Sequence, residues 1–130
     1  NMPEAVIILP DGGEFSVGEL ARQLAIVRPG KKLVYAADMA DSEANRRKMI
    51  NFAKGAHTLF CEAAFSHADR RRAAATQHLT TTAAADIARS AGVRYLVPFH
   101  FSKRYEFSPH VLYDELRAEA GAVEVIGSEI

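Results

Sequence analysis

Three short apolar segments of the chain end beside a residue that can perform acid–base or metal chemistry: Asp38, Glu62 and His100. A fourth such residue, His78, precedes the helical pattern that leads to the third segment. A carboxylate and an imidazole at one site suit a zinc or manganese ion, and a glutamate beside a histidine suits an oriented proton donor or acceptor. A lone aspartate after a strand is usually a turn former or a helix cap, but three such residues in succession make a shared site an equally good interpretation.

The histidines do not form a local metal-binding motif. They stand at positions 57, 67, 78, 100 and 110, so no two are closer than ten residues and patterns such as HxH or HExxH are absent. A catalytic zinc ion takes three protein ligands and a two-metal site takes more, whereas Asp38 and His100 supply two. The ligand count therefore predicts that the chain carries about half of a metal site.

The elements that must position these residues alternate between strands and helices. Apolar runs predict strands over 5–9, 32–37, 58–61, 93–98 and 122–126. Capped or amphipathic stretches predict helices over 16–27, 42–55, 83–90 and 108–120, and a loop with a helix over 66–77. In the second of these helices, Met49 and Phe52 are expected to face the core.

This alternation is typical of an α/β fold. The strands are almost continuously apolar, which predicts a sheet covered on both faces. Because the carboxyl ends of parallel strands meet at one edge of a sheet, we expect Asp38, His78 and His100 to converge there.

Composition limits the classes of protein to which the chain can belong. Its 130 residues predict one domain over residues 1–130, and 16 basic residues balance 16 acidic ones. Zero net charge excludes a broad basic coat for non-specific nucleic-acid binding but leaves room for a local patch. The single cysteine, Cys61, excludes a disulfide scaffold, fits the cytoplasm and is expected to be a core thiol. No apolar run approaches about 18 residues, so we expect no membrane span.

Four segments carry a resemblance to a known family: 29–38, 55–65, 78–81 and 92–105. The most specific features are the sequence His-Phe-Ser-Lys-Arg-Tyr at 100–105 and the gap of 22 residues from His78 to His100. These segments resemble the C-terminal half of ribonuclease Z-type proteins, the tRNA 3′-processing endonucleases of the metallo-β-lactamase superfamily. The resemblance implies the C-terminal half of an αββα sandwich, in which helices flank a β-sheet.

The resemblance also implies roles for the four residues introduced above. Asp38 corresponds to the aspartate that bridges two metal ions, and His100 corresponds to the last histidine ligand. His78 corresponds to the histidine that protonates the leaving 3′-oxygen, and Glu62 to the glutamate that orients this histidine. The implied cofactor is a pair of zinc ions, with manganese as the alternative.

Two further residues, Ser102 and Arg104, correspond to the family's phosphate contacts. A guanidinium suits this role because it can bind two phosphate oxygens at once. The implied substrate is precursor tRNA or another phosphodiester. The implied protein partners are the N-terminal half of the same protein and a second copy in a homodimer, with no membrane partner.

The chain departs from the family pattern in several places. The usual His-Glu-Ala-Thr reads Cys-Glu-Ala-Ala at 61–64. The N-terminal histidine cluster, the mid-chain histidine ligand and the arm that grips tRNA are missing, so we expect a C-terminal portion of a longer hydrolase that is inactive alone and binds zinc weakly. Two alternatives remain open: a metallo-β-lactamase-fold hydrolase of a small phosphodiester or other ester, and a non-catalytic α/β binding or oligomerisation domain.

Overall fold

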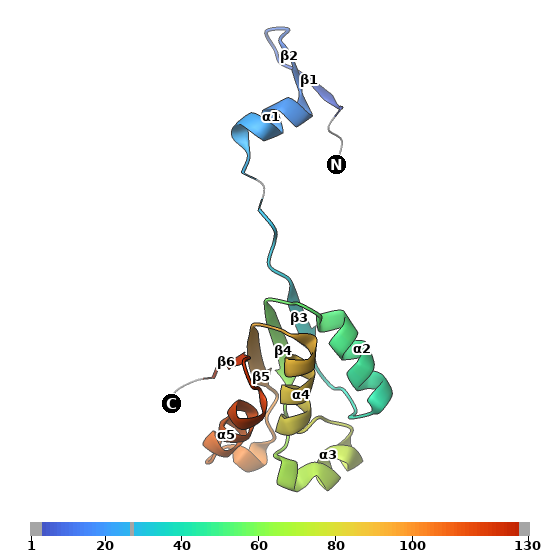
Figure 1. Cartoon of the computed structure of the whole chain (residues 1–130), viewed down its shortest axis with the longest axis vertical. Helices are drawn as coiled ribbons and strands as arrows, with labels where there is room; N and C mark the ends of the chain where they lie inside the picture. Colours follow the sequence, from blue (N-terminus) through green and yellow to red (C-terminus); the bar gives the residue numbers. More distant parts are fainter. Residues whose placement is uncertain (1–3, 27, 128–130) are drawn as a thin grey trace. The chain divides into compact units, whose positions relative to one another are not determined.

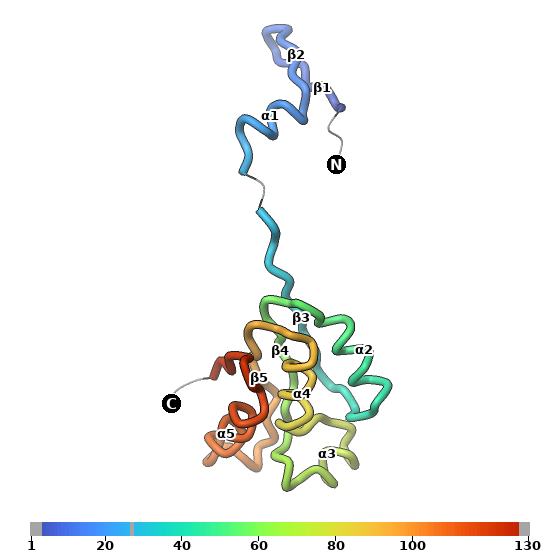
Figure 2. The backbone as a smooth tube through the Cα atoms, viewed as in Figure 1, coloured from blue at the N-terminus to red at the C-terminus, as the bar shows by residue number. Residues whose placement is uncertain are grey.

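The computed structural model describes residues 4–26 and 28–127, and their course is drawn in Figures 1 and 2. Contacts divide the chain into two units, residues 1–30 and residues 31–130. The expectation of one domain over residues 1–130 stays a prediction. All of the candidate site residues belong to the second unit.

The first unit is a β-hairpin followed by a helix. Strand β1 (Val6–Ile8) pairs antiparallel with β2 (Glu14–Ser16), and the turn between them contains Gly12 at φ 85°. Helix α1 (Val17–Leu24) begins after Ser16, whose hydroxyl accepts a hydrogen bond from the backbone N–H of Glu19 at 3.4 Å. The helix predicted over 16–27 is therefore confirmed in its main part, and residue 27 lies outside the described residues.

The second unit contains a four-stranded parallel sheet in the order β3-β4-β5-β6 (Figure 1). The strands are β3 (Leu33–Ala36), β4 (Thr58–Glu62), β5 (Tyr95–Phe99) and β6 (Glu124–Val125). Each strand is joined to the next by at least one helix, as parallel pairing requires. The carboxyl ends of β3, β4 and β5 consequently lie at one edge of the sheet.

The helices of the second unit are α2 (Glu43–Ala53), α3 (Arg70–Thr76), α4 (Thr81–Ala91) and α5 (His110–Glu119), with short 3-10 turns at His67–Asp69 and Lys103–Tyr105. The hydroxyls of Ser42 and Thr80 cap α2 and α4 by accepting backbone N–H groups. Gly92 ends α4 in the left-handed conformation, at φ 63°. These boundaries confirm the predicted helices to within a few residues.

Helix α4 packs against one face of the sheet and lies between α2 and α5 (Figure 1). Its alanines and Ile87 are buried against Leu59 and Leu96 of the two central strands. Cys61 is also buried there, and its burial, helped by the nearby Glu62, raises the pKa of the thiol to about 12. The prediction that Cys61 is a core thiol is confirmed.

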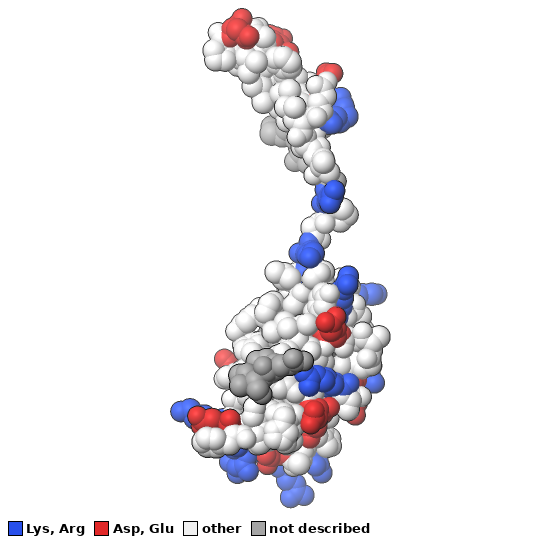
Figure 3. Space-filling view, turned by 90° about the vertical axis from the view of Figure 1, so that its left-hand side faces the viewer, with Lys and Arg blue, Asp and Glu red and all other residues white. Residues whose placement is uncertain are grey.

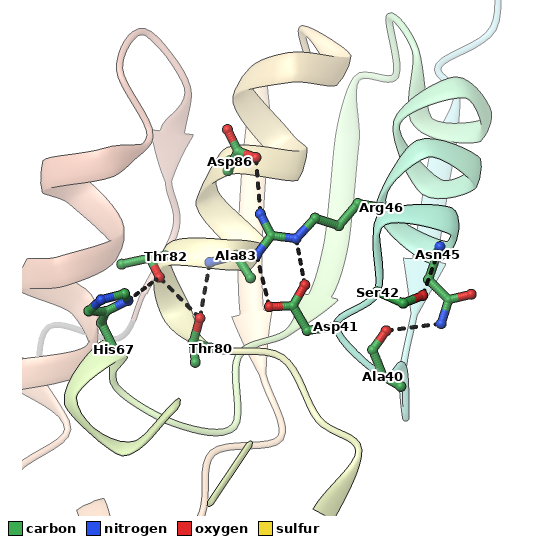
Figure 4. A network of polar contacts seen from close by, with 10 residues as sticks. All are labelled: Ala40, Asp41, Ser42, Asn45, Arg46, His67, Thr80, Thr82, Ala83 and Asp86. Atoms are coloured by element: carbon green, nitrogen blue, oxygen red, sulfur yellow. Dashed lines mark hydrogen bonds and ion pairs between the residues drawn. The ribbon is translucent and has the colours of Figure 1, made fainter. Parts of the chain in front are cut away.

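A salt-bridge network ties the loop after β3 to α4 (Figure 4). Arg46 of α2 contacts Asp41 through Nε at 2.5 Å and Nη2 at 2.8 Å, and its Nη1 lies 3.3 Å from Asp86 of α4. The hydrogen bond with Asp41 raises the pKa of Arg46 above its ordinary value. In the same loop, Asn45 Nδ2 donates to the carbonyl of Ala40 at 2.9 Å. Residues 40–46 are therefore held independently of the residues that precede them.

The opposite face of the sheet is not covered by any helix of the second unit's described residues. Leu33 and Tyr35 are 63% and 68% exposed, and the Tyr35 ring stacks on Phe99 with centroids 4.8 Å apart. We call this surface the open sheet face; its side chains are Leu33, Tyr35, Phe60, Tyr95, Val97 and Phe99. Within this unit the expectation of a sheet covered on both faces is not met, because α4 and the helices beside it pack on one side only.

The prediction that Phe52 belongs to the core is wrong. Phe52 is 63% exposed, with Lys32 Nζ 5.8 Å from its ring centroid. Helix α2 turns Met49 and Ile50, together with the fully buried Ala53, toward the core, and this orientation leaves Phe52 at the surface. None of the helices in the described part of the chain combines the length and apolar composition that crossing a membrane requires.

Two leucine substitutions test this assignment of covered and open faces. Leu59→Ala removes a fully buried side chain, so we expect the free energy of unfolding to fall by about 2–5 kcal/mol. Leu33→Ala, on the open sheet face of the neighbouring strand, is the matched control and should cost less than about 1 kcal/mol. Urea unfolding of this chain measures both, and equal losses would contradict the assignment.

Candidate metal centre

The candidate residues lie where the chain turns sharply at the carboxyl edge of the sheet. Asp38 is the second residue after β3, and His100 directly follows β5; their φ values are 51° and 61°. Among the described non-glycine residues, only Gln77, the neighbour of His78, shares this left-handed conformation. Such backbone costs of order 1–3 kcal/mol and clusters at functional sites, and aspartate and histidine tolerate it better than most residues.

Three potential metal ligands converge at this edge. One ligand atom from each of Asp38, His78 and His100 lies within 4.8 Å of the others. His100 Nδ1 is 3.4 Å from Asp38 Oδ1, and the rings of His78 and His100 meet edge to face with centroids 5.1 Å apart. The predicted convergence is confirmed, while the individual roles of these residues stay predictions.

Glu62 lies beneath this cluster as a fully buried carboxylate. Its Oε2 is 2.9 Å from His78 Nδ1 and accepts the Leu79 N–H at 3.3 Å, while its Oε1 accepts the N–H of Met39. A carboxylate can only accept hydrogen bonds, so the shared proton belongs on His78 Nδ1. Nε2 is then left as the free ring nitrogen, available to a metal ion or a proton.

Exposure increases from the buried glutamate toward the candidate ligands. The Glu62 side chain is 0% exposed and His78 24%, whereas His100 and Asp38 are 46% and 74% exposed. Two imidazoles and a carboxylate form a donor set that suits zinc and also manganese. A two-metal site needs further ligands, so the donors present here fit part of such a site.

Ser102 and Arg104 occupy the loop after β5, outside this cluster of donors. The Ser102 hydroxyl accepts the Arg104 N–H at 3.4 Å and caps the following 3-10 turn. Arg104 Nε lies 3.3 Å from Asp69 Oδ2, which also accepts the Tyr105 hydroxyl at 2.5 Å. Ser102 also borders a shallow hollow that Tyr105 helps to line. A phosphate-binding role for Ser102 and Arg104 stays a prediction.

Sequence reasoning missed two groups that organise this region, the Asp69 carboxylate and the Met39 backbone amide. Asp69 contacts Tyr105 across 36 residues of sequence, and no local motif marks such a pair. The Met39 N–H belongs to the backbone, so its residue type carries no signal of its role. Tyr105 itself is 9% exposed and packs in a small cluster with Phe65 and Leu112.

Curated relatives match most of this chain. The ribonuclease Z of Trichodesmium erythraeum is 36% identical over 117 residues, which are 90% of this chain and 34% of that protein. The ribonuclease Z of Brevibacillus brevis is 41% identical over 96 residues, which are 74% of this chain and 26% of that protein. The chain resembles ribonuclease Z. It spans about a third or less of the length of these two relatives, and no protein-family model matches it.

A solved structure supports the fold assignment. The metallo-β-lactamase fold protein YhfI from Bacillus subtilis superposes with a TM-score of 0.58 over 75% of this chain and 38% of that protein, at 24% sequence identity. The parallel sheet with its helices is thus part of a metallo-β-lactamase fold. The predicted α/β class is confirmed.

The contact between Tyr105 and Asp69 predicts a measurable change in pKa. The Tyr105 hydroxyl, aided by Arg104 and Arg72, holds the pKa of Asp69 below its ordinary value. We therefore expect Tyr105→Phe to raise the Asp69 pKa toward the ordinary value of an aspartate, as measured by NMR titration of its carboxyl carbon. Tyr113→Phe is the control and should leave it unchanged, since the Tyr113 ring packs on Phe101.

The same shift gives the sign of the effect on stability. Folding lowers the Asp69 pKa. The stability that Asp69 contributes is therefore complete at pH values above its pKa in the unfolded chain, and it is lost as pH falls through its pKa in the folded chain. The Tyr105→Phe variant should therefore lose less stability than the parent chain on acidification below about pH 4. An unchanged Asp69 pKa in Tyr105→Phe would show that the hydroxyl does not control this carboxylate.

Proposed function

We propose that the complete protein is a metal-dependent endoribonuclease that processes precursor tRNA at its 3′ end, with this chain supplying part of its active site. The observation that carries the proposal is the convergence of Asp38, His78 and His100 within 4.8 Å, above the buried Glu62. The likeness to ribonuclease Z over 90% of the chain supports the reaction class. A purely structural set of caps and turns would not need three metal-binding side chains at one point.

Asp38 and His100 are the residues that would hold metal in this proposal. When bound, zinc, or manganese as the alternative, supplies positive charge that activates water and stabilises the charge developing at phosphorus. The high exposure of both side chains fits a site that receives further ligands and a large substrate. The remaining ligands are proposed to come from the N-terminal half of the protein.

His78 is the proposed proton donor to the leaving 3′-oxygen. Its Nδ1 is fixed by Glu62 at 2.9 Å, which leaves Nε2 as the nitrogen that can hold and transfer the proton. The ring is only 24% exposed, so its orientation is restricted by packing as well as by the hydrogen bond. In this proposal Glu62 orients the His78 ring by accepting its Nδ1 hydrogen bond and does not contact the substrate.

Recognition of the phosphodiester is assigned to Ser102 and Arg104. With Nε facing Asp69, Arg104 retains both terminal amino groups for phosphate oxygens. On the face of residues 31–127 drawn in Figure 3, basic and acidic side chains are interspersed. The face drawn in Figure 3 thus has no continuous basic field, and a second candidate, a hydrolase of a small phosphodiester or other ester, would not require one.

The open sheet face is the proposed contact with the rest of the protein. Its apolar and aromatic side chains match the composition of a buried layer between two sheets. The relatives are about three times as long as the matched region, so they contain enough chain for a second sheet. We assign this second layer to the N-terminal half. A cytoplasmic location, consistent with a single buried thiol, and a homodimer complete the proposal.

Substitutions in the complete protein separate the proposed metal and proton roles. His78→Ala should retain bound metal but lower the cleavage rate by about 10²–10⁴-fold, because the leaving oxygen loses its proton donor. Asp38→Ala should lose metal as well as activity. Elemental analysis and a precursor-tRNA cleavage assay measure both effects, with His110→Ala, at the exposed start of α5, as the control. Unchanged cleavage by the His78→Ala variant would contradict the assignment of His78 as the proton donor.

A lysine on the open sheet face tests the proposed second layer. Tyr35→Lys should leave the unfolding of this chain almost unchanged, since the side chain is 68% exposed, yet destabilise the complete protein by several kcal/mol through burial of a charge. Phe107→Lys is the matched control because Phe107 is a similarly large aromatic residue that is 95% exposed and lies outside the strands that form this face. If the complete protein tolerates Tyr35→Lys as well as Phe107→Lys, the open sheet face has no such cover.

A further inference from the structure

The two oxygens of Glu62 serve different loops. Oε2 faces the loop before α4, where it meets His78 Nδ1 at 2.9 Å and the Leu79 N–H at 3.3 Å. Oε1 faces the loop after β3, where it accepts the N–H of Met39. The side chain is fully buried at the end of β4, between these two loops.

The Met39 amide is the first backbone donor after Asp38. Asp38 adopts φ 51°, a left-handed conformation that costs free energy even for an aspartate and that contacts in the surrounding structure must offset. Its own side chain is 74% exposed and contacts His100 at 3.4 Å, which gives little restraint. A hydrogen bond from the next residue to a buried carboxylate is a stronger restraint, because the acceptor is charged and has no water to compete.

The neighbouring contacts do not supply this restraint. Ala40 is held by Asn45 at 2.9 Å, and Asp41 is held by Arg46 (Figure 4). Both contacts hold residues that follow Met39 in the sequence and lead into α2. On the other side, β3 ends at Ala36. The Met39 side chain packs against the core, and among the described hydrogen bonds the one from the Met39 N–H to Glu62 is what holds the backbone of the turn at Asp38.

We propose that Glu62 is a positioning residue for the metal ligand Asp38, through the Met39 amide, in addition to orienting His78. One buried carboxylate thereby sets the separation between the metal-holding aspartate and the proton-donating histidine. The inference rests on the proposed function only in taking Asp38 as a metal ligand. It predicts an effect of Glu62 on metal binding that does not pass through His78.

The test measures zinc affinity of this chain by NMR-monitored titration with zinc alone. Glu62→Leu removes both acceptor oxygens at nearly constant volume, so the Met39 N–H loses its partner. We expect zinc binding to weaken by about 10–100-fold, the usual effect of removing a partner that orients a ligand. The weakening should persist by a similar factor when Glu62→Leu is introduced into His78→Ala, since the path through Met39 does not need the imidazole.

Hydrogen exchange of the Met39 amide provides a direct second readout. Glu62→Gln keeps one acceptor oxygen for three donors, and exchange reports whether Met39 retains it. If one Glu62 variant unfolds, the amides of Leu59 and Ile87 lose their protection from hydrogen exchange. The other Glu62 variant then still tests the positioning role. Across folded variants, zinc affinity should follow protection of the Met39 amide.

Glu115→Gln is the matched control. Glu115 is a half-buried carboxylate that also accepts a backbone amide, from His67 at 2.9 Å, and the hydroxyl of Thr81 at the start of α4, but neither donor belongs to the cluster. Its substitution should leave zinc affinity unchanged. Unchanged affinity in Glu62→Leu, or lost affinity with Met39 still protected, would overturn the positioning role. If Asp38→Ala itself leaves zinc affinity unchanged, the proposed metal site fails instead, which is a separate result.

Discussion

The site depends on one physical constraint: a carboxylate without solvent exposure must have its oxygens satisfied by donors from the protein. Glu62 meets this constraint with the Met39 amide, the Leu79 amide and the His78 ring. These donors come from two loops that are far apart in sequence but adjacent at the sheet edge. Desolvation of a single side chain thus fixes the relative position of the loops that carry the other candidate residues.

Part of this arrangement could be predicted from the sequence because it follows from strand direction. Once 32–37, 58–61 and 93–98 are taken as parallel strands, Asp38, Glu62 and His100 must share an edge. Strand β2 could not be predicted, because Glu14-Phe15-Ser16 contains one apolar residue. Phe52 was misassigned because a helical face gives only an approximate direction, and the packing of Ala53 against the core decides the actual rotation of α2.

Long-range polar pairs were beyond sequence reasoning for a different reason. The contacts of Asp69 with Arg104 and Tyr105 depend on how two loops meet, and neither loop contains a periodic pattern. The open sheet face was hidden as well. Almost continuously apolar strands indicate burial on both sides, but they do not indicate which side is covered by the chain's own helices. In this unit the covered face of the sheet holds the fully buried core. The candidate centre lies at the carboxyl edge of the sheet, where the two faces meet.

The burial of Cys61 has a practical consequence. Because it is the chain's one cysteine and its thiol has a pKa of about 12, it stays protonated and out of reach of thiol-directed reagents at neutral pH. A cysteine introduced at an exposed position is then the sole reactive thiol without any need to alter the native one. Pairs of such positions, one in each unit, would accept spin labels or fluorophores, so that the distance between the first and the second unit can be measured in solution.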